Sequence, residues 1–110
     1  MQLIYVIMKQ LNLTDELMVE LANAGVKGAT ILDSEGMAKY LYKAENVQTL
    51  DFLKQILNKE NANASKTILM AVNDDMVDTV RNTVKGVLGN FDTPNAGVMF
   101  GVPISFTDGI

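Results

Sequence analysis

The sequence predicts an α+β domain with a ferredoxin-like (split βαβ) order, in which helices cover one face of an antiparallel sheet. Two strand–helix–strand units predict this fold, one in each half of the chain, and a long connection at about 34–66 separates them. The chain has 110 residues, a usual size for one domain, and 48% of them are hydrophobic. We therefore expect a single domain over residues 1–110 with a buried core.

The first unit begins with an apolar segment at 2–8, Gln-Leu-Ile-Tyr-Val-Ile-Met, which is typical of a strand. Thr14 is a residue type that caps helices, and it precedes the expected helix. The next two residues are acids, which are favourable at the positive N-terminal end of a helix. Gly25 predicts the end of this helix. The apolar residues at helical spacing between these positions are Leu17, Met18 and Leu21. A second strand is expected at 29–33.

The connection at 34–66 has less hydrophobic periodicity. A helix is expected near 47–59, followed by a polar linker at 61–65. Long connections between compact units are usually functional or disordered. Four side chains of this loop are candidates for contact with a partner protein, although modification or simple packing would equally explain the tyrosines. These residues are Lys39, Tyr40, Tyr42 and Lys43.

The second unit contains a strand from about residue 67 and a helix that ends at about 88. Asn73 or Asp74 is the expected helix cap, and Gly89 is the expected stop. The predicted buried stripe of the helix is Met76, Val77, Val80, Val84 and Val87. A last strand is expected near 98–106, and Pro103 places it at a sheet edge because proline has no N–H to donate.

The first and third strands are apolar on both faces. In the first strand the two alternating sets are Leu3, Tyr5 and Ile7 on one side and Ile4, Val6 and Met8 on the other. A two-layer domain covers one face only, so the second face would be an exposed apolar patch. We expect an oligomer to bury it, with Ile4 and Val6 in the interface. The alternative is that the segment 34–66 folds back over this face.

Composition excludes several kinds of function. The chain has no Cys and no His, which removes disulfides, thiolate nucleophiles and the commonest transition-metal ligands and general base. Nine basic residues against 13 acidic ones give a net charge of −4 without a basic stripe, so nucleic-acid binding is not expected. No metal site is predicted.

Location is predicted from two further features. No apolar segment approaches the roughly 20 residues that a membrane helix needs, so membrane insertion is not expected. The chain enters its first apolar segment directly after Met1, without a basic leader. A cytoplasmic protein is the expectation from these features.

Candidate chemical groups have simpler explanations in the fold. Asp74 and Asp75 resemble a carboxylate dyad, but a helix start favours acids there. Asp78 and Arg81 are spaced for a solvated ion pair on one helix face. Gly97 either lets a backbone approach a ligand or permits a turn, and the turn is favoured.

The segment 72–80 closely resembles the PII signal-transduction proteins, in which a Val-x-Asp-Asp-x-Val-Asp-Thr motif joins a strand to a helix. The helix and turn at 14–28, followed by Ala-Thr-Ile, are similar to the family's first helix and its Gly-x-Thr-Val strand. Gly36 resembles the glycine that opens the family's long T-loop. Asp-Phe-Leu-Lys at 51–54 is similar to the end of that loop without its proline. The resemblance covers most of the chain.

The resemblance implies a function. PII proteins are homotrimers that are not enzymes; they bind adenine nucleotides, often with 2-oxoglutarate, between subunits, and their T-loops dock on transporters, enzymes or regulators. By this likeness the loop 34–66 would contact a target protein. One wall of the ligand cleft would contain Gly28, Ala29, Thr30 and Gly36 of one subunit. The neighbouring subunit would supply the loop 91–98, with Phe91, Asn95, Gly97 and Val98.

The chain departs from the family where phosphates are bound. The family has a glycine-rich loop with a lysine, and arginines on the last strand. This chain has Asn-Phe-Asp-Thr-Pro-Asn-Ala-Gly at 90–97, and no Lys or Arg follows Lys85. Backbone amides alone supply little charge for a triphosphate. No cofactor is therefore certain, and the expected effector is a less charged nucleotide, a cyclic dinucleotide, a small anion or another metabolite.

Two other classes share this fold. An acylphosphatase-like hydrolase needs an anion cradle with a well-placed cation, but the sequence pairs Arg81 with Asp78. A structural or metal-tolerance trimer resembling the CutA proteins is the other alternative, and the lack of His and Cys argues against copper or zinc binding.

Overall fold

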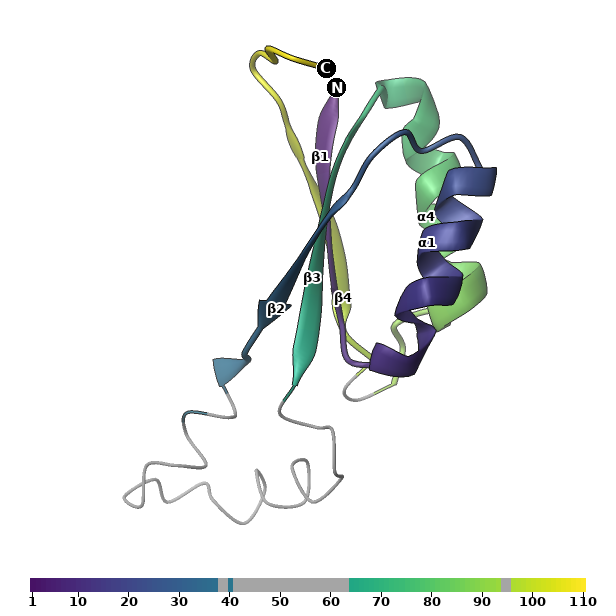
Figure 1. Ribbon diagram of the computed structural model, residues 1–110, viewed down its shortest axis with the longest axis vertical. Coiled ribbons are helices and arrows are strands. Elements are labelled where there is room, and N and C mark those ends of the chain that lie inside the picture. Colours follow the sequence, from purple (N-terminus) through teal and green to yellow (C-terminus); the bar gives the residue numbers. More distant parts are fainter. Residues whose placement is uncertain (38–39, 41–63, 94–95) are drawn as a thin grey trace.

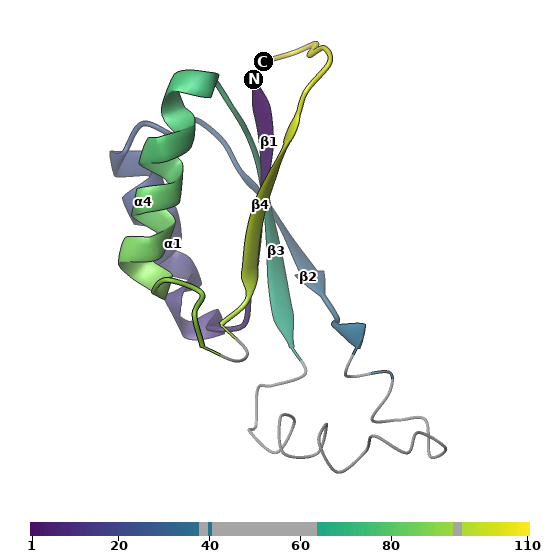
Figure 2. The same cartoon turned by 180° about the vertical axis from the view of Figure 1, so that it is seen from behind.

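Four antiparallel strands form one sheet, and two helices lie against one of its faces (Figures 1 and 2). The computed structural model describes residues 1–37, 40, 64–93 and 96–110. The strands are β1 (Gln2–Met8), β2 (Thr30–Ser34), β3 (Ser65–Val72) and β4 (Val98–Pro103). The α-helices are α1 (Thr14–Asn23) and α4 (Val77–Leu88). The order β2-β3-β1-β4 places β1 and β3 in the centre, which confirms the expected strand positions and is compatible with a ferredoxin-like arrangement.

The core lies between the sheet and the helices. Val6 of β1 is opposite Ile68 of β3 and Met99 of β4, so these three side chains share the face that the helices cover. The buried apolar side chains of the cluster are Ile4, Val6, Met8, Leu17, Leu21, Ile68, Met70, Val72, Val80, Val84 and Leu88. The expectation that Ile4 and Val6 lie in an interface between chains is therefore wrong. Strand periodicity separates the two faces, but it does not say which face the helices cover.

The helix α1 ends as predicted but begins differently. Gly25 has φ 105°, its N–H donates to the Ala22 carbonyl, and the Val26 N–H donates to the Leu21 carbonyl, which is the Schellman ending. Thr14, in contrast, is the first residue of the helix rather than its cap. A 3-10 turn leads directly into α1, and the Thr14 hydroxyl donates to the Leu11 carbonyl at 2.8 Å.

The second unit follows the prediction with small differences. Asn73 precedes a 3-10 turn (Asp74–Met76) that leads into α4, but its side chain makes no capping hydrogen bond. Gly89 closes α4 with φ 93°. Leu88 joins the buried stripe. The predicted stripe residues Met76, Val77 and Val87 are only partly buried.

The remaining differences concern the ends of strands. β4 stops at Pro103 rather than near residue 106, because proline ends the hydrogen-bonded ladder there. β3 begins at Ser65, inside the predicted linker. The helix expected near 47–59 lies outside the described residues. Among the residues that the structure describes, none of the helices has the length and apolar character to cross a membrane.

Gly97 enters β4 through a conformation that other residues disfavour. Its φ is 95°, and a Cβ built at this position would lie 2.2 Å from the Ile7 carbonyl oxygen. Backbone packing against β1 therefore requires glycine here, in agreement with the structural explanation of this residue. Gly86, within α4, is different because a Cβ there would have no atom within 4 Å.

We predict opposite stability effects from adding one methyl group at these two glycines. Gly97→Ala should lower the free energy of unfolding by at least about 2 kcal/mol, through the positive φ and the clash with β1. Gly86→Ala should raise it by about 0.5–1 kcal/mol, because alanine favours a helix interior. Urea unfolding followed by circular dichroism, at equal protein concentrations, measures both. Equal stability of the two variants would contradict this account of Gly97.

Candidate functional site

A groove of about 590 Å³ lies between α4 and the edge strand β4. Figure 2 shows the side of the molecule on which these two elements lie. On the helix-facing side of β4, Met99 is flanked by two residues without side chains, Gly97 and Gly101. Because the strand carries so little volume there, α4 and β4 leave a hollow between them. Glycine within a strand often marks such an approach site.

Two cations line this groove. Val77, Arg81 and Lys85 follow one another at intervals of one helical turn, so they share the flank of α4 that borders β4. The amide side chains of Gln2 and Asn90 line the groove as well. None of the described lining residues is acidic. The groove is therefore a positive site on a chain of net charge −4.

The predicted ion pair of Arg81 is present but weak. Its guanidinium lies 3.8 Å from the carboxylate of Asp78, and both side chains are exposed. Such surface pairs contribute about 0–1 kcal/mol. The interpretation of Arg81 as only a partner of Asp78 missed its place in the groove. The spacing of Val77, Arg81 and Lys85 predicts that they share one side of α4. The sequence does not show that β4 lies beside that side, so the spacing alone could not reveal the groove.

Three of the four residues predicted on the 91–98 wall line the groove, namely Phe91, Gly97 and Val98. The fourth, Asn95, lies outside the described residues. Phe91 has φ 58° and is the one non-glycine residue of the described chain with positive φ. Backbone outliers of this kind cluster at binding sites. Phe91 also packs against the core cluster, which holds it beside the groove.

The other predicted wall lies elsewhere in the chain. Gly28, Ala29, Thr30 and Gly36 are exposed residues in or beside β2. β2 and β4 are the two opposite edges of the sheet, so one chain does not bring the two walls together (Figure 1). A single cleft containing both walls requires a second chain.

The predicted partner-binding loop is represented by Tyr40 alone. Lys39, Tyr42 and Lys43 lie outside the described residues. Tyr40 is exposed and lines a second hollow of about 530 Å³ at the end of β2, together with Leu11, Asp33 and Ser65. This hollow marks the place where the connection 34–66 leaves the sheet.

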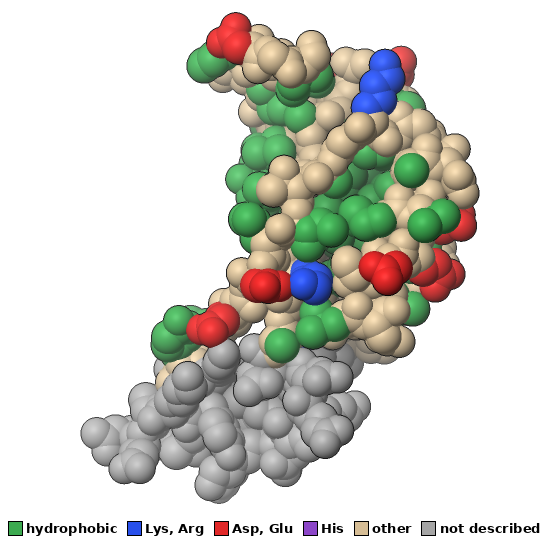
Figure 3. Space-filling view, in the orientation of Figure 1, with side chains coloured by type: hydrophobic (Ala, Val, Ile, Leu, Met, Phe, Trp, Pro, Cys, Tyr) green, Lys and Arg blue, Asp and Glu red, His purple; other side chains and the backbone are tan. Residues whose placement is uncertain are grey.

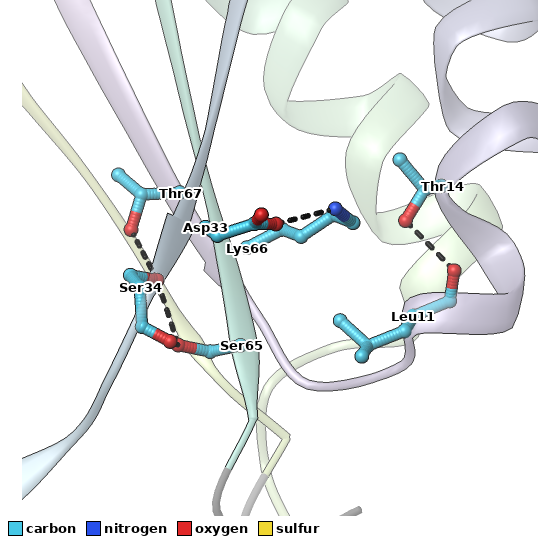
Figure 4. Close-up of polar contacts among 7 residues, drawn as sticks. All are labelled: Leu11, Thr14, Asp33, Ser34, Ser65, Lys66 and Thr67. Carbon is cyan, nitrogen blue, oxygen red and sulfur yellow. Dashed lines mark hydrogen bonds and ion pairs between the residues drawn. The ribbon is translucent and has the colours of Figure 1, made fainter.

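Hydroxyl groups join β2 to β3 at that place (Figure 4). The Thr67 hydroxyl donates to Ser34 Oγ at 2.9 Å. The Ser34 and Ser65 hydroxyls are 2.7 Å apart, and Ser65 Oγ also donates to the Ser34 carbonyl at 3.1 Å. These contacts fix the ends of both strands below the connection.

A charged pair joins the same two strands on the other face. Lys66 Nζ lies 2.7 Å from Asp33 Oδ1 (Figure 4). The hydrogen bond from Lys66 and then its charge lower the pKa of Asp33, against a smaller opposing effect of desolvation. The described residues contain no group of three His, Cys, Asp or Glu side chains that could hold a metal ion.

The sheet face opposite the helices carries apolar and hydroxyl side chains, and we call it the open face. Its residues are Leu3, Tyr5, Ile7, Thr30, Leu32, Ser34, Ser65, Thr67, Leu69, Ala71, Val98, Phe100 and Val102. None of these is charged. The rings of Tyr5 and Phe100 stack at 4.8 Å, and Phe100 is still 44% exposed. Figure 3 shows hydrophobic side chains along the side of the sheet that faces away from the helices.

Comparisons with protein-family models and with curated proteins find no match for this chain.

We predict that Lys66→Gln raises the pKa of Asp33 toward its ordinary value of 3.8. Because the folded-state pKa is depressed, the pair stabilises the native chain above the unfolded-state pKa, and this contribution disappears as the pH falls through the folded-state value. A carboxyl-detected NMR titration of Asp33 in both proteins measures the change. Lys27→Gln is the matched control, since Lys27 lies away from β2–β3 pairing and should leave Asp33 unchanged. An identical Asp33 titration in Lys66→Gln would contradict the assignment.

Proposed function

We propose that this chain is a PII-like regulatory protein, which assembles as a homotrimer through the open face and binds a small molecule between subunits. The observation that carries the proposal is the uncharged open face, which extends over every strand of the sheet. An apolar patch of this extent on a soluble monomer is unusual, because burying it against another surface is favourable.

The position of the two predicted cleft walls supports the same assembly. The residues around Gly28 and Gly36 lie at one edge of the sheet, and Phe91 and Gly97 lie beside the other. Association through the open face would bring the β2 edge of one chain near the β4 edge of its neighbour. A cleft built in this way exists only in the assembled protein, so ligand binding there would depend on assembly.

Signalling is assigned to the connection 34–66. It leaves the sheet where Ser34, Ser65 and Thr67 fix the strand ends, so a ligand that acts on β2 has a defined path to the connection. Binding without catalysis fits the groove chemistry, because the described lining residues include no carboxylate or imidazole that could act as a general base.

We predict that Val102→Asp converts the trimer into folded monomers, because it places a charge in a dry interface. Val102 is 39% exposed on the open face. Val19→Asp is the matched control, since Val19 is 56% exposed on α1 and lies outside that face. Light scattering after size exclusion measures mass, and circular dichroism checks folding. A monomeric wild-type protein at micromolar concentration would overturn the proposed assembly.

We also expect a ligand of the trimer to raise its melting temperature, because binding to the native state alone stabilises it. A thermal-shift screen should include adenylates, cyclic dinucleotides, keto acids and simple organic anions. The Val102→Asp monomer is the comparison: a shift that only the trimer shows reports on the cleft between subunits, whereas a shift that both proteins show reports on a site within one chain. A complete absence of shifts with the trimer would count against a sensor function.

A further inference from the structure

The charges of the groove are sharply different from those of the chain as a whole. The chain has 13 acidic and nine basic residues. The groove between α4 and β4 nevertheless places Arg81 and Lys85 together, and no acid is among its described lining residues. In a partly enclosed hollow, two neighbouring cations attract an anion more strongly than they would on an open surface.

Both cations are available to a ligand. Within the described residues, the Lys85 ammonium has no hydrogen bond or ion pair, although its side chain is partly buried. Arg81 has only the 3.8 Å contact with Asp78, whose side chain is 90% exposed and can be solvated instead. Lys66, in contrast, is already held by Asp33 at 2.7 Å. The groove therefore holds one cation without a described partner, Lys85, and one that is only weakly paired, Arg81.

The rest of the groove suits an apolar body. Phe91 and Met99 line it beside the cations, and its volume of about 590 Å³ lies within the roughly 300–1,000 Å³ of small-molecule pockets. The amides of Gln2 and Asn90 add hydrogen-bonding capacity. β4 is an edge strand, so one row of its backbone N–H and C=O groups has no sheet partner among the described strands.

We propose that this groove binds an organic anion, whose phosphate or carboxylate group contacts Arg81 and Lys85 while a flat apolar body packs against Phe91 and Met99. This inference deepens the proposed function and rests on it in one respect, since the groove would form one wall of the cleft between subunits. The binding charges come from α4, whereas the sequence led us to expect backbone amides of the loop 91–98 as the only anion contacts.

The test uses the full chain, labelled with ¹⁵N, and four probes that separate head group from body. Phenyl phosphate and benzoate carry both parts, inorganic phosphate carries the head group alone, and benzyl alcohol carries the body alone. We expect phenyl phosphate or benzoate to shift the amide signals of Phe91, Gly97 and Gly101. Each of the two incomplete probes should bind at least about tenfold more weakly, because it loses either the charged hydrogen bonds or the apolar contact.

Charge variants complete the test. Arg81→Gln and Lys85→Gln should each weaken binding of the charged probe by about tenfold, and the double variant should abolish detectable binding. Lys27→Gln removes the same charge outside the groove and should leave the affinity unchanged within about twofold. Raising the salt concentration should weaken binding in the wild type, because exposed charges are screened.

The outcomes are separable from those of the proposed assembly. Unchanged affinity in the double variant, or amide shifts confined to residues away from α4 and β4, would overturn the anion site. Light scattering on the same samples reports the oligomeric state. A wild-type monomer that binds the probe through Arg81 and Lys85 would refute the trimer and support the anion site. A wild-type trimer that binds none of the four probes would refute the anion site and support the assembly.

Discussion

The central constraint on this molecule is that its sheet has two apolar faces, whereas the helices of the described residues lie on only one of them. Ile4, Val6 and Met8 are covered by α1 and α4, and the core follows from that packing. Tyr5 alternates with them and stacks on Phe100 on the uncovered side. A strand cannot turn one set of side chains inward without turning the other set outward. The central strands that build the core with one set of side chains therefore present a hydrophobic surface with the other set, and that surface is the physical basis of the proposed assembly.

β4 contributes to both the proposed interface and the proposed ligand groove, because its alternate residues face opposite sides of the sheet. Phe100 and Val102 point to the open face, whereas Gly101 on the other side leaves room for the groove. A change in the position of this edge strand would alter both surfaces at once. Ligand binding in the groove and association through the open face would then be coupled by linkage, because both surfaces include residues of β4. Such coupling needs no contact between the ligand and the more distant strands.

Local patterns predicted most of the fold. Alternation identified β1 and β3, and Gly25 and Gly89 correctly marked the ends of both helices, because glycine at a positive φ is a local requirement. The errors concern relations between distant segments. The sequence separates the two faces of β1 but does not indicate which one meets the helices, so the expectation that Ile4 and Val6 lie in an interface is wrong. The groove was missed for the same reason: Arg81 and Gly101 come together only when α4 packs beside the edge strand.

The family resemblance and the proposed ligand chemistry depend on different residues. The resemblance is strongest at 72–80, where Asn73 precedes a 3-10 turn and Val80 enters the core. Those positions build the strand-to-helix connection, and Asp74 also lies 3.1 Å from the amino group of Met1. A motif with such structural roles supports a shared fold more directly than a shared ligand. Val77 is the one residue of this segment that lines the groove, and the groove cations Arg81 and Lys85 lie beyond the motif. The charge and shape of the groove are therefore the better guide to what it binds.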